Sequence, residues 1–287
     1  MELLLSQLIT GLSSSAELFL TTIGLVIIFG MLDVVNMAHG EFIMLGAYSV
    51  CVFNNNFGIP FFIAVILSFV FTAFLGCLLE HFVIRKFYGK VAETLLATFA
   101  LTYILPEIVK SFFGPENQKV STPIPGNISF GHITIPYYDM FIVLMAVVFL
   151  LGTLILFYKT KFGIQLRSIT QNRQMSQCLG LNSGKIDKMT FAYGCGLGGA
   201  AGALLAPVVS VTPSMGTEYV VDSFLVVILG GLDSIIGSFF GSFVIEESTS
   251  AMSSAMSMVN AKLLIFIIII VLIRFKPQGL FTAKDKR

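Results

Sequence analysis

Long apolar runs recur along almost the whole of this chain, and they limit its fold more than any other feature. Crossing the hydrocarbon core of a bilayer takes about 20 apolar residues per helix. The 287 residues are 56% hydrophobic and 11% charged, with a mean hydropathy of +0.91, which excludes a soluble globule. The clearest spans are Pro60–Val83, Glu93–Phe113, Asp139–Tyr158, Lys188–Val211 and Val259–Phe275.

Two further apolar regions are interrupted in their middle. Glu17–Phe53 is broken by "DVVNMAHGE" at Asp33–Glu41, and Tyr219–Ser250 is broken by "GGLDSIIG" at Gly230–Gly237. Irregular backbone at membrane depth survives only where protein or a wet cavity satisfies its polar groups. We therefore predict an all-α polytopic membrane protein, with a single transmembrane domain over residues 1–287 and eight to nine transmembrane or half-spanning helices that include glycine-broken hairpins.

The basic residues predict the orientation, because cytoplasmic loops of membrane proteins retain Lys and Arg. They form three clusters, which we place inside the cell together with the C-terminus, while the N-terminus lies outside. Residues 114–138 then form an external loop and residues 159–188 a cytoplasmic one. The clusters are Arg85, Lys86 and Lys90; Lys159, Lys161, Arg167, Arg173, Lys185 and Lys188; and Arg274, Lys276, Lys284, Lys286 and Arg287.

The first break holds polar groups where an apolar chain tolerates few. The helix that follows it, ending near Phe53, is too short to cross the core, so the polar groups lie inside the bilayer or at its inner margin. Asn36 is a suitable N-cap for that helix. Ionisable groups at such depth usually face a bundle interior or a pathway. The candidate substrate-path residues at this break are Asp33, Asn36, His39, Gly40 and Glu41. For these residues we favour a structural role, which stabilises the break by capping and hydrogen bonding, over direct contact with the substrate.

The second break repeats the local sequence of the first. "LVIIFGMLD" (Leu25–Asp33) and "LVVILGGLD" (Leu225–Asp233) share six of nine residues. Paired glycine-interrupted segments are a pointer to a transporter's substrate path. An evolutionary repeat and a chance match in an apolar alphabet both remain open. The candidate path residues at this break are Gly230, Gly231 and Asp233.

Small residues and a polar loop supply the other candidate sites. Gly194, Gly198 and Gly202 recur every four residues, which lets another helix approach closely. Packing within the chain is favoured over a subunit interface. The inside loop is polar and helix-forming from Ile164 to Leu179, with Gly180 placed to end that helix. Such a helix suits docking to another protein, although an ordinary solvated connector is the simpler interpretation.

Several functions are disfavoured by what the sequence does not contain. No GxxxxGK[ST] phosphate loop occurs, so any energy from ATP comes from a partner. No Ser/His/Asp or metal-ligand constellation occurs, and the four cysteines lack metal-type spacing, so neither an enzyme nor a metal or other cofactor is predicted. The small net charge of +1 argues against nucleic acid as a partner.

The motifs resemble one family of membrane proteins. "GLVIIFGMLDVVNMAHGEFIMLGAY" and "RSITQNRQMSQCLGL" followed by "DKMTFAYGCGLGGAAG" are similar to the branched-chain amino acid type permeases of ATP-binding-cassette importers. Within that family, "TQNR", "CLG", "YVVDSF" and "KPQGLF" are more similar to the permease of urea importers, whereas "VSVTPSMGTEY" departs from it. The alternative within the family is a branched-chain amino acid importer.

The resemblance implies a multisubunit importer in the inner membrane. It implies a heterodimer with a second permease, two cytoplasmic ATP-binding subunits and an external solute-binding protein. Coupling to the ATPases is assigned by resemblance to Arg167, Thr170, Gln171, Asn172 and Arg173. A passive channel for a small neutral solute is the rival from another class, and a secondary transporter is third. The basic internal helix separates them, because a passive pore has no need of it.

Overall fold

The computed structural model describes residues 2–130, 133–232, 234–276 and 279–280. Nine of the eleven α-helices in these residues have 13 residues or more, which confirms the predicted all-α fold. The α-helices are α1 (Glu2–Leu32), α2 (His39–Cys51), α3 (Phe61–Phe82), α4 (Val91–Phe113), α5 (Tyr137–Lys159), α6 (Lys161–Gln171), α7 (Arg173–Cys178), α8 (Ser183–Leu205), α9 (Met215–Gly230), α10 (Ile235–Ser253) and α11 (Met258–Phe275).

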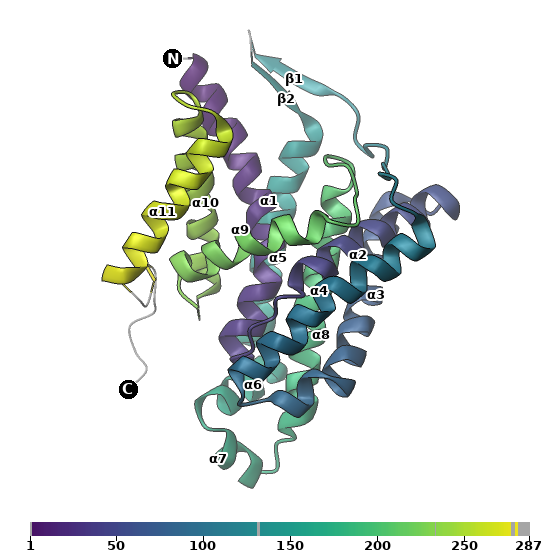
Figure 1. Ribbon diagram of the computed structural model, residues 1–287, viewed down its shortest axis with the longest axis vertical. Helices are drawn as coiled ribbons and strands as arrows, with labels where there is room; N and C mark the ends of the chain where they lie inside the picture. The colour runs from purple at the N-terminus through teal and green to yellow at the C-terminus, as the bar shows by residue number, and fades with distance from the viewer. Residues whose placement is uncertain (1, 131–132, 233, 277–278, 281–287) are drawn as a thin grey trace.

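Short elements join some of these helices. A π-helical turn, Val52–Asn56, extends α2, and a 3₁₀ turn, Ile84–Phe87, follows α3. Strands β1 (Asn127–Phe130) and β2 (Ile133–Pro136) form an antiparallel hairpin with Ile128 opposite Ile135. The hairpin and the N-terminus lie at one end of the molecule, and α6 and α7 lie at the other (Figure 1).

Five helices in the described residues are long and apolar enough to cross a membrane, or six when the bent pair α9 and α10 counts as one span. Four of them match the predicted spans. The fifth, residues 7–32 of α1, was expected to be one arm of a broken hairpin but forms a full-length helix. The predicted span Lys188–Val211 corresponds to α8, which ends at Leu205 and is not among these five helices.

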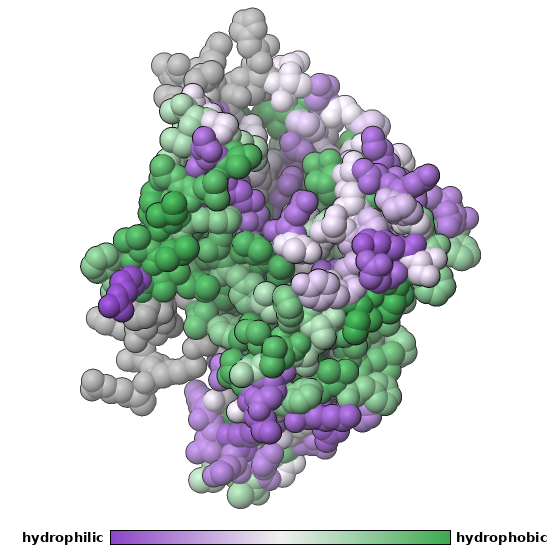
Figure 2. Space-filling model, in the orientation of Figure 1, coloured by the Kyte–Doolittle hydropathy of each residue, from purple (hydrophilic) through white to green (hydrophobic). Residues whose placement is uncertain are grey.

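Burial separates an inner group of helices from an outer one. In α1, 78% of the apolar stretch is buried, against 17% in α4 and in α11, so α1 lies inside and the other two lie at the surface of the chain. All of α2 except Leu45 is buried, and α8 packs between α1, α2 and α3. Figure 2 shows the resulting hydrophobic band, with a hydrophilic end over α6 and α7.

Candidate functional site

The first break begins with a sharp turn at the end of α1. Asp33 has φ of 56° and is the one non-glycine residue with positive φ in the described part of the chain. Its N–H donates to the carbonyl of Phe29 at 3.0 Å. Aspartate is among the few residues that visit the left-handed region. The chain thus leaves α1 in a new direction and begins α2 at His39.

A remote threonine on α4 holds the break in place. Thr98 is fully buried, and its Oγ1 accepts from the N–H of Met37 at 3.1 Å. Its single proton can be donated to the carbonyl of Val35 at 3.2 Å or to that of Leu95 in its own helix at 3.1 Å. Buried backbone groups that leave a helix need such partners. Thr98 could not be recognised from the sequence, because it lies 61 residues from Met37 and is one of several threonines on apolar helices.

Asn36 does not cap α2, contrary to the sequence prediction. The N-cap is Ala38, which makes no side-chain cap, and Asn36 lies two residues too early in the chain to reach the free amides. The Asn36 carbonyl accepts from the His39 N–H at 3.2 Å. Its side chain is fully buried, and neither Oδ1 nor Nδ2 has a hydrogen-bond partner among the described residues. Because an unpaired buried amide is costly, it is a candidate for contact with a solute.

His39 lies where three helices meet. Its Nε2 is 2.8 Å from the carbonyl oxygen of Thr21 on α1, and a carbonyl can only accept, so Nε2 carries the proton and donates. Glycines make room for the ring: a Cβ at Gly24 or Gly198 would lie within 2.9 Å of its Cε1. His39 thus joins α1, α2 and α8 and is fully buried.

Gly40 and Glu41 lie against the first turn of α9. A Cβ at Gly40 would overlap the carbonyl of Gly216, so the two backbones touch. Glu41 is 2% exposed, and its Oε2 has no hydrogen-bond partner among the described residues. The same oxygen lies 2.9 Å from the position that a Cβ on Gly216 would take. A carboxylate is favoured beside a helix N-terminus.

The second break is tighter and is capped by its own residues. α9 ends at Gly230, and Gly231 follows with φ of 101°. Ser234 caps α10, its Oγ accepting from the N–H of Gly237 at 2.9 Å. A Cβ at Gly230 would meet the Gly237 carbonyl at 2.6 Å, so the arms of this hairpin also meet through backbone. Asp233, predicted as a path residue, lies outside the described residues.

One cavity brings the two breaks together. It has a volume of about 490 Å³ and lies at the end of α1, where Asp33 and Leu232 of the two breaks share it with Thr170, Arg173 and Asp187. A second cavity of about 300 Å³ is lined by Asp33 and Arg173 as well. Asn36, His39 and Glu41 line neither cavity, so the structure divides the predicted path residues into a buried group and a cavity-lining group.

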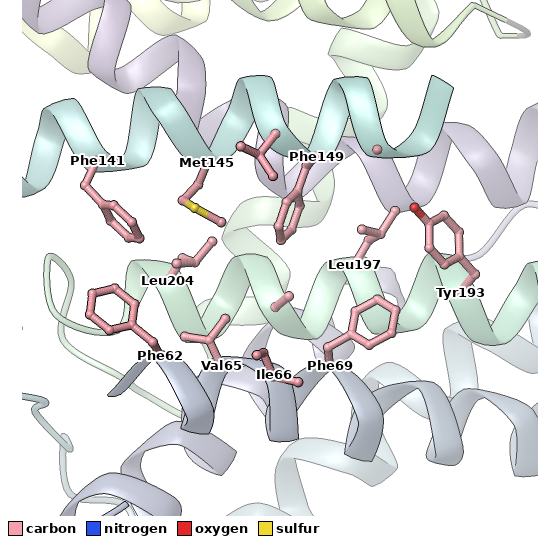
Figure 3. Close-up of a pocket in the computed structure, with 13 residues that line it drawn as sticks. Phe62, Val65, Ile66, Phe69, Phe141, Met145, Phe149, Tyr193, Leu197 and Leu204 are labelled. Carbon is pink, nitrogen blue, oxygen red and sulfur yellow. The ribbon is translucent and has the colours of Figure 1, made fainter. Parts of the chain in front are cut away.

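A different groove, about 480 Å³, is apolar and lies between α3 and α5 over α8 (Figure 3). Phe62 and Phe69 of α3 and Phe141 and Phe149 of α5 point into it. The hydroxyl of Tyr193 at one end is already hydrogen-bonded to Thr153 at 3.0 Å. With no unpaired polar group to receive a polar solute, this groove is not a candidate path.

The loop that we predicted to be cytoplasmic, residues 159–188, forms two short helices instead of the single helix expected from Ile164 to Leu179. The break is at Asn172, whose Oδ1 accepts from the N–H of Met175 at 3.0 Å and caps α7. Asparagine competes with a helix by such local bonds and favours caps, which is why α6 stops there. Gly180 has φ of 83° and follows α7, in the position expected for it.

The residues assigned to coupling by resemblance point in different directions. Gln171 and Asn172 are exposed, whereas Arg167 stacks over the ring of Tyr158 at 4.9 Å. The Thr170 Oγ1 is 3.2 Å from the carbonyl of Met31 in the last turn of α1. Arg173 is exposed as well, with 46% of its side chain accessible, but its guanidinium forms an ion pair with the buried Asp187 of α8, a partner that the sequence does not indicate.

The glycine row of α8 lies against neighbouring helices of the same chain. A Cβ at Gly194 would meet Ile28 and the Gly24 carbonyl of α1, and one at Gly202 would overlap the Ile43 carbonyl of α2. Gly46 of α2 and Gly199 of α8 touch in the same way, a contact that the every-fourth-residue pattern does not include.

The long helices, the buried glycine contacts and the two broken hairpins define a multi-pass membrane transport protein. The family described as "Branched-chain amino acid transport system / permease component" matches residues 7–273 of the chain. The chain therefore belongs to this permease family and is not an enzyme. The resemblance noted in the sequence is confirmed at the level of the family.

Relatives of known description align along most of the chain. The high-affinity branched-chain amino acid transport system permease protein BraD of Pseudomonas aeruginosa is 24% identical over 96% of this chain and 95% of its own. The probable branched-chain amino acid transport permease protein LivH of Methanocaldococcus jannaschii is 26% identical over 92% and 88%. The LivH protein of Escherichia coli K12 is 23% identical over 96% and 94%. No solved structure matches the chain.

Proposed function

We propose that this chain forms half of the translocation path of an ATP-driven importer, and that its solute is urea or a closely similar small amide. The observation that supports this choice of solute is the set of buried polar atoms at the first break without a hydrogen-bond partner among the described residues. They are Oδ1 and Nδ2 of Asn36, Nδ1 of His39 and Oε2 of Glu41. The Glu41 carboxylate and Asn36 Oδ1 can accept from the N–H groups of an amide, and Asn36 Nδ2 can donate to its carbonyl.

The basic side chains on the spans do not favour a carboxylate as the solute's main group. Lys110 is bound to Glu107 at 2.6 Å, and Lys262 is bound to Asp222 at 2.5 Å. Both cations are thus already paired. A neutral amide needs no such cation, which is why the site suits urea better than an amino acid.

Branched-chain amino acids are the second candidate, because the relatives carry that description in their names. Glu41 would then bind the ammonium group, and the carboxylate would lie near a helix N-terminus such as the first turn of α9. The side chains at the first break could therefore bind an amino-acid zwitterion as well as urea, and transport measurements are needed to decide between the two solutes.

The partners we propose are a second permease, two cytoplasmic ATPases and an external binding protein. The exposed end of α7 supports docking of an ATPase. Met175 is 59% exposed and Leu179 is 74% exposed, so two apolar side chains at the end of α7 are available for burial against a partner. The exposed Gln171 and Asn172 adjoin this surface.

The test is transport by the complex reconstituted in vesicles with its ATPases and binding protein. We expect ATP-dependent accumulation of radiolabelled urea and no accumulation of leucine. Leucine uptake without urea uptake would overturn the solute but keep the importer. Uptake of either solute without ATP would favour a channel or a secondary transporter and overturn the proposal.

Variants of the site sharpen this test. Asn36→Leu removes the carbonyl and the NH2 of the side-chain amide at nearly the same volume. We expect urea uptake to fall at least about tenfold, the effect of one lost hydrogen bond to a solute. Ser254→Ala is the control, because its hydroxyl bonds only the carbonyl of Ala251 at an exposed helix end. Unchanged urea uptake by an assembled Asn36→Leu complex would exclude Asn36 from the solute site.

A further inference from the structure

Arg173 is an exposed-loop residue whose charged group is directed inward. It is the first residue of α7, and its Nη2 pairs with Oδ2 of Asp187 on α8, a side chain that is only 1% exposed. Its guanidinium carbon also lies 5.6 Å from the centre of the Tyr88 ring, which follows α3. One cation therefore ties the cytoplasmic loop to the inner ends of two long helices.

The carboxylates beneath Arg173 make this tie hard to release. Asp187 is buried, and the fully buried Glu80 of α3 lies close enough to interact electrostatically with both Asp187 and Tyr88. Separating a buried carboxylate from its cation leaves an uncompensated charge away from water. A displacement of α7 is therefore expected to carry the inner end of α8 with it.

Space around Arg173 allows such a displacement. Arg173 lines both the 490 Å³ and the 300 Å³ cavity, together with Leu32 and Asp33 at the end of α1. Two neutral bonds add to the connection: Thr170 bonds the Met31 carbonyl at 3.2 Å, and Gln177 bonds the Ser183 hydroxyl at 2.8 Å. Beyond α8, Gly198 lies against His39 at the first break, so the connection is continuous from α7 to the candidate path.

We propose that the ion pair of Arg173 with Asp187 transmits movement of α6 and α7 to α8 and the first break, so that Arg173 is a positioning residue and not part of the ATPase docking surface. This inference rests on the proposed function, because it needs an ATPase that docks on the loop. Docking is then the task of Met175 and Leu179, and transmission is the task of Arg173 and Asp187. Loss of docking should reduce the amount of bound ATPase, whereas loss of transmission should reduce only the stimulation of ATP hydrolysis.

The experiment measures two quantities on the reconstituted complex: the amount of copurified ATPase, and the stimulation of ATP hydrolysis by solute-loaded binding protein. For Arg173→Gln and Asp187→Asn we expect normal copurification and basal hydrolysis, with stimulation reduced about tenfold, within the usual range of coupling between sites. The double variant should be no worse than either single one, because both remove the same link. Arg173→Lys keeps the pair and should keep most of the stimulation.

Two controls separate the roles. Lys185→Gln removes a positive charge from the same loop at an exposed site with no carboxylate partner among the described residues, and should behave as wild type. Leu179→Asp should lose the copurified ATPase. Wild-type stimulation in Arg173→Gln, multiplied losses in the double variant, or equal losses in Arg173→Lys and Arg173→Gln would each overturn the inference. A wild-type complex without an ATPase would overturn the proposed function and the inference together.

Discussion

α1 and α9 end in nearly the same sequence, "LVIIFGMLD" and "LVVILGGLD", yet the two breaks that follow are built differently. α1 continues to Leu32 and turns at Asp33, whereas α9 stops at Gly230, two positions earlier in the alignment, and turns at Gly231. Both turns use a positive φ. Gly231 ends α9 directly after Gly230, because glycine reaches a positive φ without strain.

The two breaks differ more in the residues that stabilise them than in the conformation of their turns. Ser234 caps α10 from within the second break, and the axes of α9 and α10 differ by 115°. The first break has no such local cap, is held by Thr98 of α4, and leaves the side chain of Asn36 unpaired. A break that is stabilised by a side chain from another helix can leave its own polar side chains free to bind a solute. A break that is capped by its own residues uses those side chains for the cap. We therefore propose that the solute binds at the first break.

The largest expected effect comes from the glycine that follows the first break. Gly40→Val places a side chain into the carbonyl of Gly216, and overpacking of this kind costs about 3 kcal/mol or more. Uptake should fall to background, and the amount of assembled complex on size-exclusion chromatography should fall with it. Gly152→Val is the control, since nothing lies within 4 Å of a Cβ at Gly152. Normal transport by Gly40→Val would show that the close contact of α2 with α9 is not required for assembly or uptake.

An intermediate effect is expected at the outside support of the first break. Thr98→Val keeps the shape of the side chain but removes both of its bonds to the break, and the unpaired Met37 N–H costs about 1–3 kcal/mol. The midpoint of thermal unfolding in detergent should drop. Thr102→Val, one turn later on α4, removes only a bond to the carbonyl of Phe99 and should change the midpoint less. Equal shifts in the two variants would mean that α4 does not support the break.

The smallest effect is expected at the second break. Ser234→Ala removes the cap of α10, and loss of an N-cap costs about 1 kcal/mol. The unfolding midpoint should shift by less than in Thr98→Val, with solute affinity unchanged. A larger shift for Ser234→Ala than for Thr98→Val would reverse the comparison and make the second break the one that limits stability.

The sequence predicted the features that local chemistry determines. Apolar run length predicted four of the spans, and the paired glycine-containing segments predicted the two breaks, although α1 continues past Gly30 to Leu32 whereas α9 ends at Gly230. The capping role given to Asn36 was wrong, because the helix start at His39 depends on contacts with Thr21 and Gly216 from distant parts of the chain. The support by Thr98 and the pairing of Arg173 with Asp187 could not be predicted for the same reason: threonines and exposed-loop arginines are common, and only the fold selects their partners. The role of residues 159–188 in coupling and the solute-contacting set stay predictions.

The backbone contacts between α1, α2, α8 and α9 have a consequence for how the protein moves. At Gly24 with Gly194, Gly46 with Gly199, and Gly202 with Ile43, main chains approach so closely that no side chain separates them. Helices in contact through flexible side chains can slide by changing rotamers, but helices in contact through main chain have no rotamers to change, and Cα–H groups facing carbonyls add weak attraction. We expect α1, α2 and α8, with the first turn of α9 that contacts α2, to move as one rigid body when α6 and α7 displace α8. Shear and hinge motions then occur at its borders, in α4 and in the α9–α11 segment beyond that turn.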